Sequence, residues 1–310
     1  MSAELSVREY ELAIPGMRVA GRLWAWGDAR ERLPVLALHG FQDNAASFDV
    51  LVPALHGAAA APPMQVLAID LAGHGQSSWR SPGVGYFVMD YAADALAVAD
   101  AMGWERFAVI GHSLGAGIAT LLGGAVPERL SGAVLIDGLG PVSMAPGAGP
   151  RLAARAFSER AKLRARVADG RGRALATLEE AADIRAGARI AIERDAARRL
   201  VGRGTRPDAS GGWAWSADPH LARTSFSRLT EDTVLAYLGA MQVPTLLFEA
   251  DDGVLHSLPA ERYAARVAAH PQLSRCGLPG RHHLHMEASA TPLAERTASF
   301  LRAHGGRPTG

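Results

Sequence analysis

The sequence has little that would mark a disulfide-bonded, membrane-spanning or nucleic-acid-binding protein. Its 310 residues include a single cysteine, Cys276, which excludes an internal disulfide and a cysteine-based zinc site. Acidic and basic residues nearly cancel to a net charge of +1, so nothing favours nucleic acid or an anionic membrane as a partner. No apolar run approaches the roughly 18 residues that span a bilayer, and Met1–Tyr10 lacks the apolar core of a signal peptide. We therefore expect a cytoplasmic protein without a membrane span.

The chain does contain a series of short apolar runs that predict buried strands. Helical patterns separate most of these runs, and strand–helix alternation favours a parallel sheet with helices on both faces. Ahead of them, two alternating segments on either side of Pro15-Gly16 predict an antiparallel hairpin. The expected strands are Leu5–Ile14, Met17–Trp26, Pro34–Leu38, Val66–Asp70, Phe107–Ile110, Ala133–Asp137, Val243–Phe248 and Gln272–Leu278.

The alternation stops between Pro141 and Gln242, where about a hundred residues carry no strand signal. Arg151–Ala168 and Arg173–Leu200 are rich in alanine and arginine and predict helices, whereas Arg203–Asp218 is expected to be a loop. A structureless loop of this length is improbable in a compact domain. We therefore predict an inserted helical cap over residues 141–242, with residues 1–140 and 243–310 forming one core domain.

One motif gives the first indication of chemistry. The run Phe107–Ile110 leads directly into Gly111-His112-Ser113-Leu114-Gly115, and small and apolar residues at helical spacing follow. A G-x-S-x-G motif between a strand and a helix predicts a nucleophile elbow, a strained turn that presents the serine hydroxyl at the sheet edge. Such a serine needs a base to take its proton and an acid to orient that base. Candidates for both follow in the chain, in the order serine, aspartate, histidine.

With these features the chain resembles the α/β-hydrolase family, in particular its cap-bearing, serine-hydrolase-like branch. The resemblance extends over nearly the whole length. It implies the α/β-hydrolase fold: a mostly parallel eight-stranded sheet flanked by helices, with an inserted helical cap. The motifs that carry it are Leu38-His39-Gly40-Phe41, the loop Asp70–Ser77, the elbow, Val243–Leu247 and the histidine-rich segment Pro279–Glu287.

The resemblance implies a catalytic triad built on Ser113. The family's catalytic histidine follows a Gly-x pair after the last strand, and His282 matches that position. For the acid, Asp252 lies at about the family's spacing after the strand that ends at Phe248, and it is the first choice. Asp137 and Asp251 remain alternatives.

The remaining site predictions concern the oxyanion hole and the other histidines. The backbone N–H groups of Phe41 and Leu114 are expected to stabilise the oxyanion. The other histidines of the motifs are expected to hold loops in place, and no set of residues at metal-ligand spacing is evident. No metal and no cofactor are therefore expected. These histidines are His39, His74, His112, His283 and His285.

A serine at position 113 also restricts the reaction. Resembling dehalogenases and epoxide hydrolases use aspartate there, because a serine ether could not be released. The expected enzyme is thus a carboxylesterase-like serine hydrolase that forms an acyl-enzyme with a small-molecule substrate. Thioesterase, lactonase, carbon–carbon bond hydrolase and cofactor-free perhydrolase remain alternatives, and a ligand-binding receptor or pseudoenzyme is an alternative of another class. The oligomeric state, monomer or homodimer, stays open.

Overall fold

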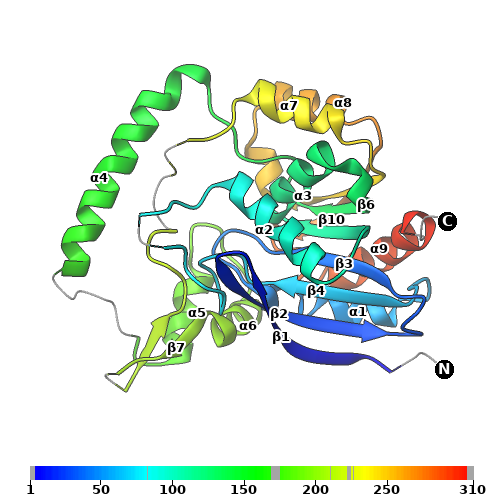
Figure 1. Ribbon diagram of the computed structural model, residues 1–310, viewed down its shortest axis with the longest axis horizontal. Helices are drawn as coiled ribbons and strands as arrows, with labels where there is room; N and C mark the ends of the chain where they lie inside the picture. Colours follow the sequence, from blue (N-terminus) through cyan, green and yellow to red (C-terminus); the bar gives the residue numbers. More distant parts are fainter. Residues whose placement is uncertain are drawn as a thin grey trace.

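The computed structural model describes residues 4–81, 83–168, 175–209, 211–221, 225 and 227–305. Its centre is an eight-stranded sheet in the order β1-β2-β4-β3-β5-β6-β9-β10, which confirms the predicted α/β-hydrolase architecture (Figure 1). The strands are β1 (Ser6–Ile14), β2 (Met17–Trp26), β3 (Leu33–Leu38), β4 (Met64–Ile69), β5 (Phe107–His112), β6 (Leu130–Ile136), β9 (Thr245–Asp252) and β10 (Leu273–Arg281).

The direction of each strand follows the sequence pattern. β1 and β2 form the predicted antiparallel hairpin, and β2 also runs antiparallel to β4. The remaining pairs are parallel. Every residue of β5 and β6 is buried, as expected for central strands covered on both faces. The carboxyl ends of β3, β5, β6, β9 and β10 therefore meet along one edge of the sheet, where ligand sites of such sheets lie.

Helices cover both faces of the sheet (Figure 1). One face packs against α1 (Leu51–Gly57) and α9 (Ala290–His304), whose apolar side chains share a core with β3, β4 and β6. The other packs against α2 (Val88–Ala101), α3 (Leu114–Ala125), α7 (Glu231–Ala240) and α8 (Ala260–Ala269). Short 3-10 turns lie at Ala45–Phe48, Pro127–Arg129, Pro146–Ala148 and Val254–Ser257.

The segment predicted as a cap contains α4 (Gly149–Ala168), α5 (Leu178–Ala186), α6 (Arg194–Gly204), β7 (Thr205–Pro207) and β8 (Trp213–Trp215). The helix predicted over Arg173–Leu200 is wrong in part, because Gly187 follows the end of α5 and α6 starts only at Arg194; residues 173 and 174 lie outside the described chain. Thr177 fixes the start of α5 by accepting the Glu180 N–H, an N-cap that the prediction overlooked. The loop predicted over Arg203–Asp218 contains the antiparallel pair β7–β8.

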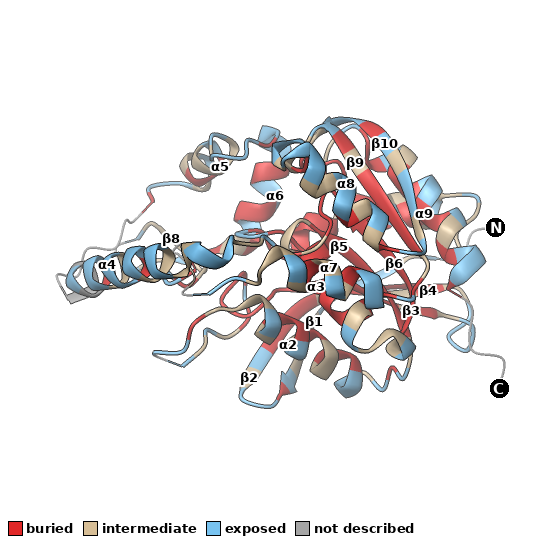
Figure 2. Ribbon diagram, turned by 90° about the horizontal axis from the view of Figure 1, so that it is seen from above, coloured by how far each residue is buried: buried red, intermediate tan, exposed pale blue. Residues whose placement is uncertain are grey.

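The inserted segment is not one packed unit. α5, α6 and the β7–β8 pair share a small apolar cluster of their own, whereas α4 leads away from the sheet with much of its surface exposed (Figure 2). α7, also within residues 141–242, packs on α3 and buries Val234 and Leu238 in the core. Among the described residues, no helix has the length and apolar character needed to cross a membrane.

Candidate active site

Ser113 stands between β5 and α3 in a backbone conformation that serine rarely adopts. Its φ is 51° and its ψ is −106°, in the left-handed half of the map where a side chain is strained. The turn is fixed on both sides: the Ser113 N–H donates to the carbonyl of Ile136, and its own carbonyl accepts from Gly117. The serine side chain is thereby held at the carboxyl edge of the sheet, at the start of helix α3.

The two glycines of the motif are required by close backbone contacts. A Cβ on Gly111 would lie 2.4 Å from the carbonyl oxygen of Gly115, and a Cβ on Gly115 would lie 1.9 Å from that of Leu38. Both distances are far below van der Waals contact, so a side chain at either position would force the helix away from the sheet. The glycines therefore permit the tight strand–turn–helix connection that presents Ser113.

His282 lies just after β10 and is bonded to Asp137. Its Nδ1 is 2.6 Å from Oδ2 of Asp137, which is fully buried at the end of β6. The same carboxylate oxygen accepts the Val254 N–H at 2.8 Å. Because β6 lies next to β5 in the sheet, this carboxylate–histidine pair and Ser113 occupy neighbouring strand ends.

The first-choice acid, Asp252, is not the partner of His282 in the structure, so this pairing is corrected to Asp137. Asp252 and Asp251 are both exposed at the end of β9, and Asp252 pairs in the ladder with Arg281. The physical reason is the backbone turn after β6: Asp137 has a φ of 43°, and its carboxylate packs over Gly253. A Cβ at Gly253 would lie 2.3 Å from Oδ1 of Asp137, so the glycine makes room for this carboxylate.

The predicted oxyanion donors lie on neighbouring strand ends. β3 and β5 pair in parallel with Leu38 opposite Gly111, so Phe41 and Leu114 each follow that pair by three residues. After β3 the chain turns sharply, with Gln42 at a φ of 64° and the Asp43 N–H bonded to the Gly40 carbonyl. Leu114 is the first residue of α3, where backbone N–H groups have no partner within the helix. This arrangement makes both N–H groups candidates for stabilising an oxyanion.

Two of the loop histidines bond to backbone as expected. His39 accepts the Leu71 N–H at Nε2 and donates from Nδ1 to the Gly40 carbonyl, while His74 donates to the Ala72 carbonyl. Burial lowers the pKa of His39 to about 4 and that of His74 to about 3, so both rings are neutral at pH 7. They hold the loops after β3 and β4.

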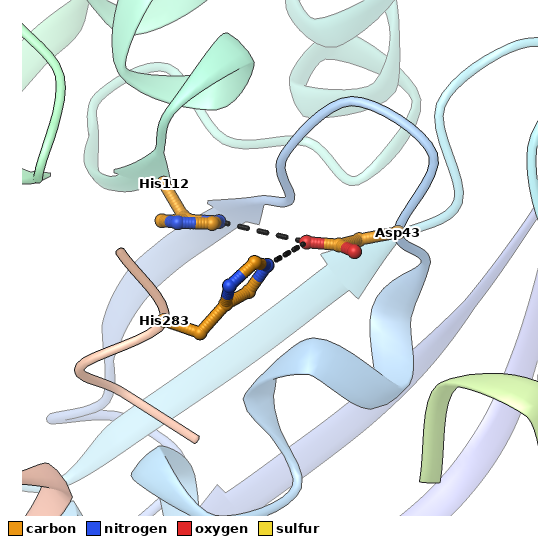
Figure 3. A group of neighbouring side chains, drawn as sticks. All are labelled: Asp43, His112 and His283. Atoms are coloured by element: carbon orange, nitrogen blue, oxygen red, sulfur yellow. Dashed lines mark ion pairs between the residues drawn. The ribbon is translucent and has the colours of Figure 1, made fainter. Parts of the chain in front are cut away.

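A second polar cluster lies beside His282 and was not expected from the sequence (Figure 3). It joins Asp43, His112 and His283, which come from the loop after β3, the last residue of β5 and the loop after β10. Oδ2 of Asp43 is 3.6 Å from Nδ1 of His112 and 3.3 Å from Nε2 of His283. Arg185 of α5 reaches the cluster from the inserted segment, 2.6 Å from the other oxygen of Asp43. These residues are far apart in the chain, so no local spacing could have indicated them.

The fold and the elbow define an α/β hydrolase with serine at the nucleophile position, and the similar proteins agree. The model of the alpha/beta hydrolase fold family matches residues 34–183. A serine hydrolase-like protein of Danio rerio is 28% identical over 90% of this chain and 83% of its own length, and a probable serine hydrolase of Drosophila melanogaster is 28% identical over 96% of this chain and 89% of its own. The solved structure of a hypothetical protein of Pseudomonas aeruginosa PAO1 is 37% identical, with a TM-score of 0.84, over 94% of this chain and 99% of that one.

The chain therefore belongs to the α/β-hydrolase superfamily, in its serine-hydrolase-like branch.

Proposed function

We propose that the protein hydrolyses carboxylic esters through an acyl-enzyme on Ser113. The observation that carries the proposal is the bond between His282 Nδ1 and Asp137 Oδ2, at 2.6 Å, beside a serine held at a strained elbow. Because Nδ1 donates to the carboxylate, the other ring nitrogen, Nε2, is free to accept a proton. His282 is thus the proposed base, and Asp137 the acid that orients it.

The proposed reaction has two halves. Oγ of Ser113 attacks the ester carbonyl carbon while His282 Nε2 takes its proton, and the N–H groups of Phe41 and Leu114 donate to the oxyanion. His282 then gives the proton to the leaving alkoxide, which departs as the alcohol and leaves an ester on Ser113. In the second half His282 takes a proton from water, the hydroxide attacks the acyl carbon, and the proton returns to Ser113 Oγ as the acid leaves.

The surroundings of the site support an apolar substrate. Several large apolar side chains are exposed on segments that follow the parallel strands at the edge that carries Ser113. Phe41 follows β3, Val84 follows β4, and Val142, with 71% of its surface exposed, follows β6. Exposed apolar side chains on these segments favour contact with an apolar partner. We therefore propose esters with a medium or long acyl chain as substrates.

A panel of p-nitrophenyl esters from acetyl to decanoyl tests this function. We expect kcat/KM to rise with chain length, by about threefold to fourfold per buried CH2 from its transfer free energy of ~0.8 kcal/mol. Ser113→Ala should abolish turnover and labelling by a fluorophosphonate. A panel of acyl thioesters and lactones tests the alternative thioesterase and lactonase activities. Turnover of none of these compounds, together with an unlabelled Ser113, would contradict the hydrolase and favour a receptor or pseudoenzyme.

Two asparagine variants separate the candidate acids. Asp137→Asn keeps the size of the side chain but removes the charge that stabilises the protonated His282. We expect kcat to fall by roughly 10² to 10⁴. Asp252→Asn is the matched control at the exposed end of β9 and should stay within about twofold of the parent. The opposite pattern would return the role of the acid to Asp252.

A further inference from the structure

Three electron-pair donors converge beside the active site, in the cluster of Asp43, His112 and His283 (Figure 3). One ligand atom from each of the three residues lies within 4.8 Å of the other two. The three residues are at least 98% buried. Lone pairs that converge in a buried place repel each other. They therefore need a hydrogen atom or a cation between them.

The hydrogen-bond partners decide which ring nitrogens carry a hydrogen. Nε2 of His112 lies 3.0 Å from the carbonyl oxygen of His282; a carbonyl only accepts, so Nε2 must donate. A neutral ring that carries its hydrogen on Nε2 presents a lone pair at Nδ1. Arg185, which only donates, lies 3.3 Å from Nε2 of His283, so that nitrogen is also an acceptor.

The lone-pair atoms of Asp43 and His112 face each other, but no hydrogen bond links them. Within the described part of the chain, Oδ2 of Asp43 and Nδ1 of His112 have no hydrogen-bond partner. Gly40 packs against the same two atoms. A Cβ there would lie 2.7 Å from Nδ1 of His112 and 3.0 Å from Oδ2 of Asp43.

The chemistry of the donors and two of their three separations match a tetrahedral transition-metal site. Zinc bonds of about 2.0–2.1 Å place neighbouring ligand atoms roughly 3.3–3.4 Å apart. The separations of 3.3 Å and 3.6 Å from Asp43 to the two histidines are close to this. Two imidazoles and a carboxylate form a ligand set that zinc favours. The bond from His112 to the carbonyl of His282 is the outer contact by which metal-binding histidines are oriented.

We propose that Asp43, His112 and His283 form a binding site for Zn²⁺ or a similar divalent transition metal, with Arg185 as the group that competes with the metal. The Arg185 guanidinium neutralises Asp43, and its side chain is 12% exposed on α5. Binding requires this cation to turn away from the site, because a second positive charge there opposes the metal. Water would supply the fourth ligand.

Such a site would regulate the proposed hydrolysis. Each ligand stands close in the chain to a proposed catalytic group: His112 precedes Ser113, and His283 follows His282. Bound metal would pull the segments that carry Ser113, Phe41 and His282 toward one centre. We therefore expect it to slow acylation. This consequence rests on the proposed function, whereas metal binding itself can be measured without turnover.

Titration of the full chain with Co²⁺ and Zn²⁺ after chelator treatment tests the site. We expect one Co²⁺ per chain with the intense visible absorption of a tetrahedral ion, and its displacement by Zn²⁺. His283→Gln and Asp43→Asn should each weaken binding by more than roughly tenfold. Arg185→Gln should tighten it by roughly tenfold or more, because the competing charge is gone. Circular dichroism and thermal unfolding establish that each variant is folded.

The matched control is His220→Gln, which removes a half-exposed histidine paired with Asp218 at 2.8 Å. If His220→Gln loses the Co²⁺ absorption while His283→Gln binds Co²⁺ fully, the metal occupies an adventitious surface site. That result would overturn the proposal. Absence of binding both in the parent and in Arg185→Gln would overturn it as well. The two proposals can fail separately. If Ser113→Ala still binds metal and the parent turns over no ester, the proposed function fails while the metal site stands.

Discussion

Gly253→Ala is the most informative single substitution for the proposed acid, because it changes neither the serine, the histidine nor the carboxylate. Gly253 has an extended backbone, with a φ of −100° and a ψ of 174°, which alanine adopts without strain. The nearest obstacle is the carboxyl group of Asp137. A Cβ would lie 2.3 Å from Oδ1, 2.5 Å from Oδ2 and 2.6 Å from Cγ of Asp137.

The size of the effect follows from these distances. Restoring an ordinary contact of about 3.4 Å requires a displacement of about 1 Å. Moved that far, the Nδ1–Oδ2 bond of 2.6 Å between His282 and Asp137 would stretch beyond hydrogen-bonding range. A misplacement of ~1 Å in an active site can cost about 10²-fold in rate, and complete loss of the acid about 10⁴-fold. We expect kcat to fall within that interval, with a stability loss of about 1–3 kcal/mol from overpacking.

The assay compares steady-state ester hydrolysis and urea unfolding for the parent, Gly253→Ala and Gly277→Ala. Gly277 lies on β10, where an added Cβ meets nothing within 4 Å, so this control should keep both activity and stability. Retention of more than half of the parent kcat by a folded Gly253→Ala protein would refute the role of Asp137. Equal losses of kcat and of stability in both variants would mean that any added side chain at this part of the sheet has the same effect.

Three further outcomes are expected. Gly115→Ala, whose Cβ would lie 1.9 Å from the Leu38 carbonyl oxygen, should lower the free energy of unfolding by about 3 kcal/mol or more; an unchanged urea midpoint would contradict the contact. Arg203→Met leaves the fully buried Asp70 without the guanidinium 2.9 Å away and should cost about 3–5 kcal/mol in urea unfolding. Finally, histidines held neutral by burial bind one proton fewer when folded than when unfolded. The free energy of unfolding should therefore fall as pH drops below about 6.5, by up to ~1.4 kcal/mol per pH unit for each histidine. A urea midpoint that stays flat between pH 6.5 and 5 would contradict their burial in the neutral form. These histidines are His39, His74, His112 and His285.

The sequence determined the fold and the position of the proposed nucleophile, because both are local patterns. Short apolar runs separated by helical segments specify a mostly parallel sheet. The elbow is specified by glycines at 111 and 115, for which the structure gives steric reasons. Local signals also existed for the start of α5, in the N-cap Thr177, and for the break between α5 and α6, in Gly187. In that segment the alanine- and arginine-rich composition misled the prediction.

Only the tertiary structure decided which acid meets His282. Asp137 follows β6 and Asp252 ends β9, and the two strands are neighbours in the sheet, so chain spacing cannot separate them. The left-handed turn at Asp137 and the space above Gly253 bring one carboxylate to the ring, while the other stays exposed. The cluster of Asp43, His112 and His283 has the same origin. Its members are brought together by parallel strands whose carboxyl ends share one edge, a proximity that no local pattern in the chain records.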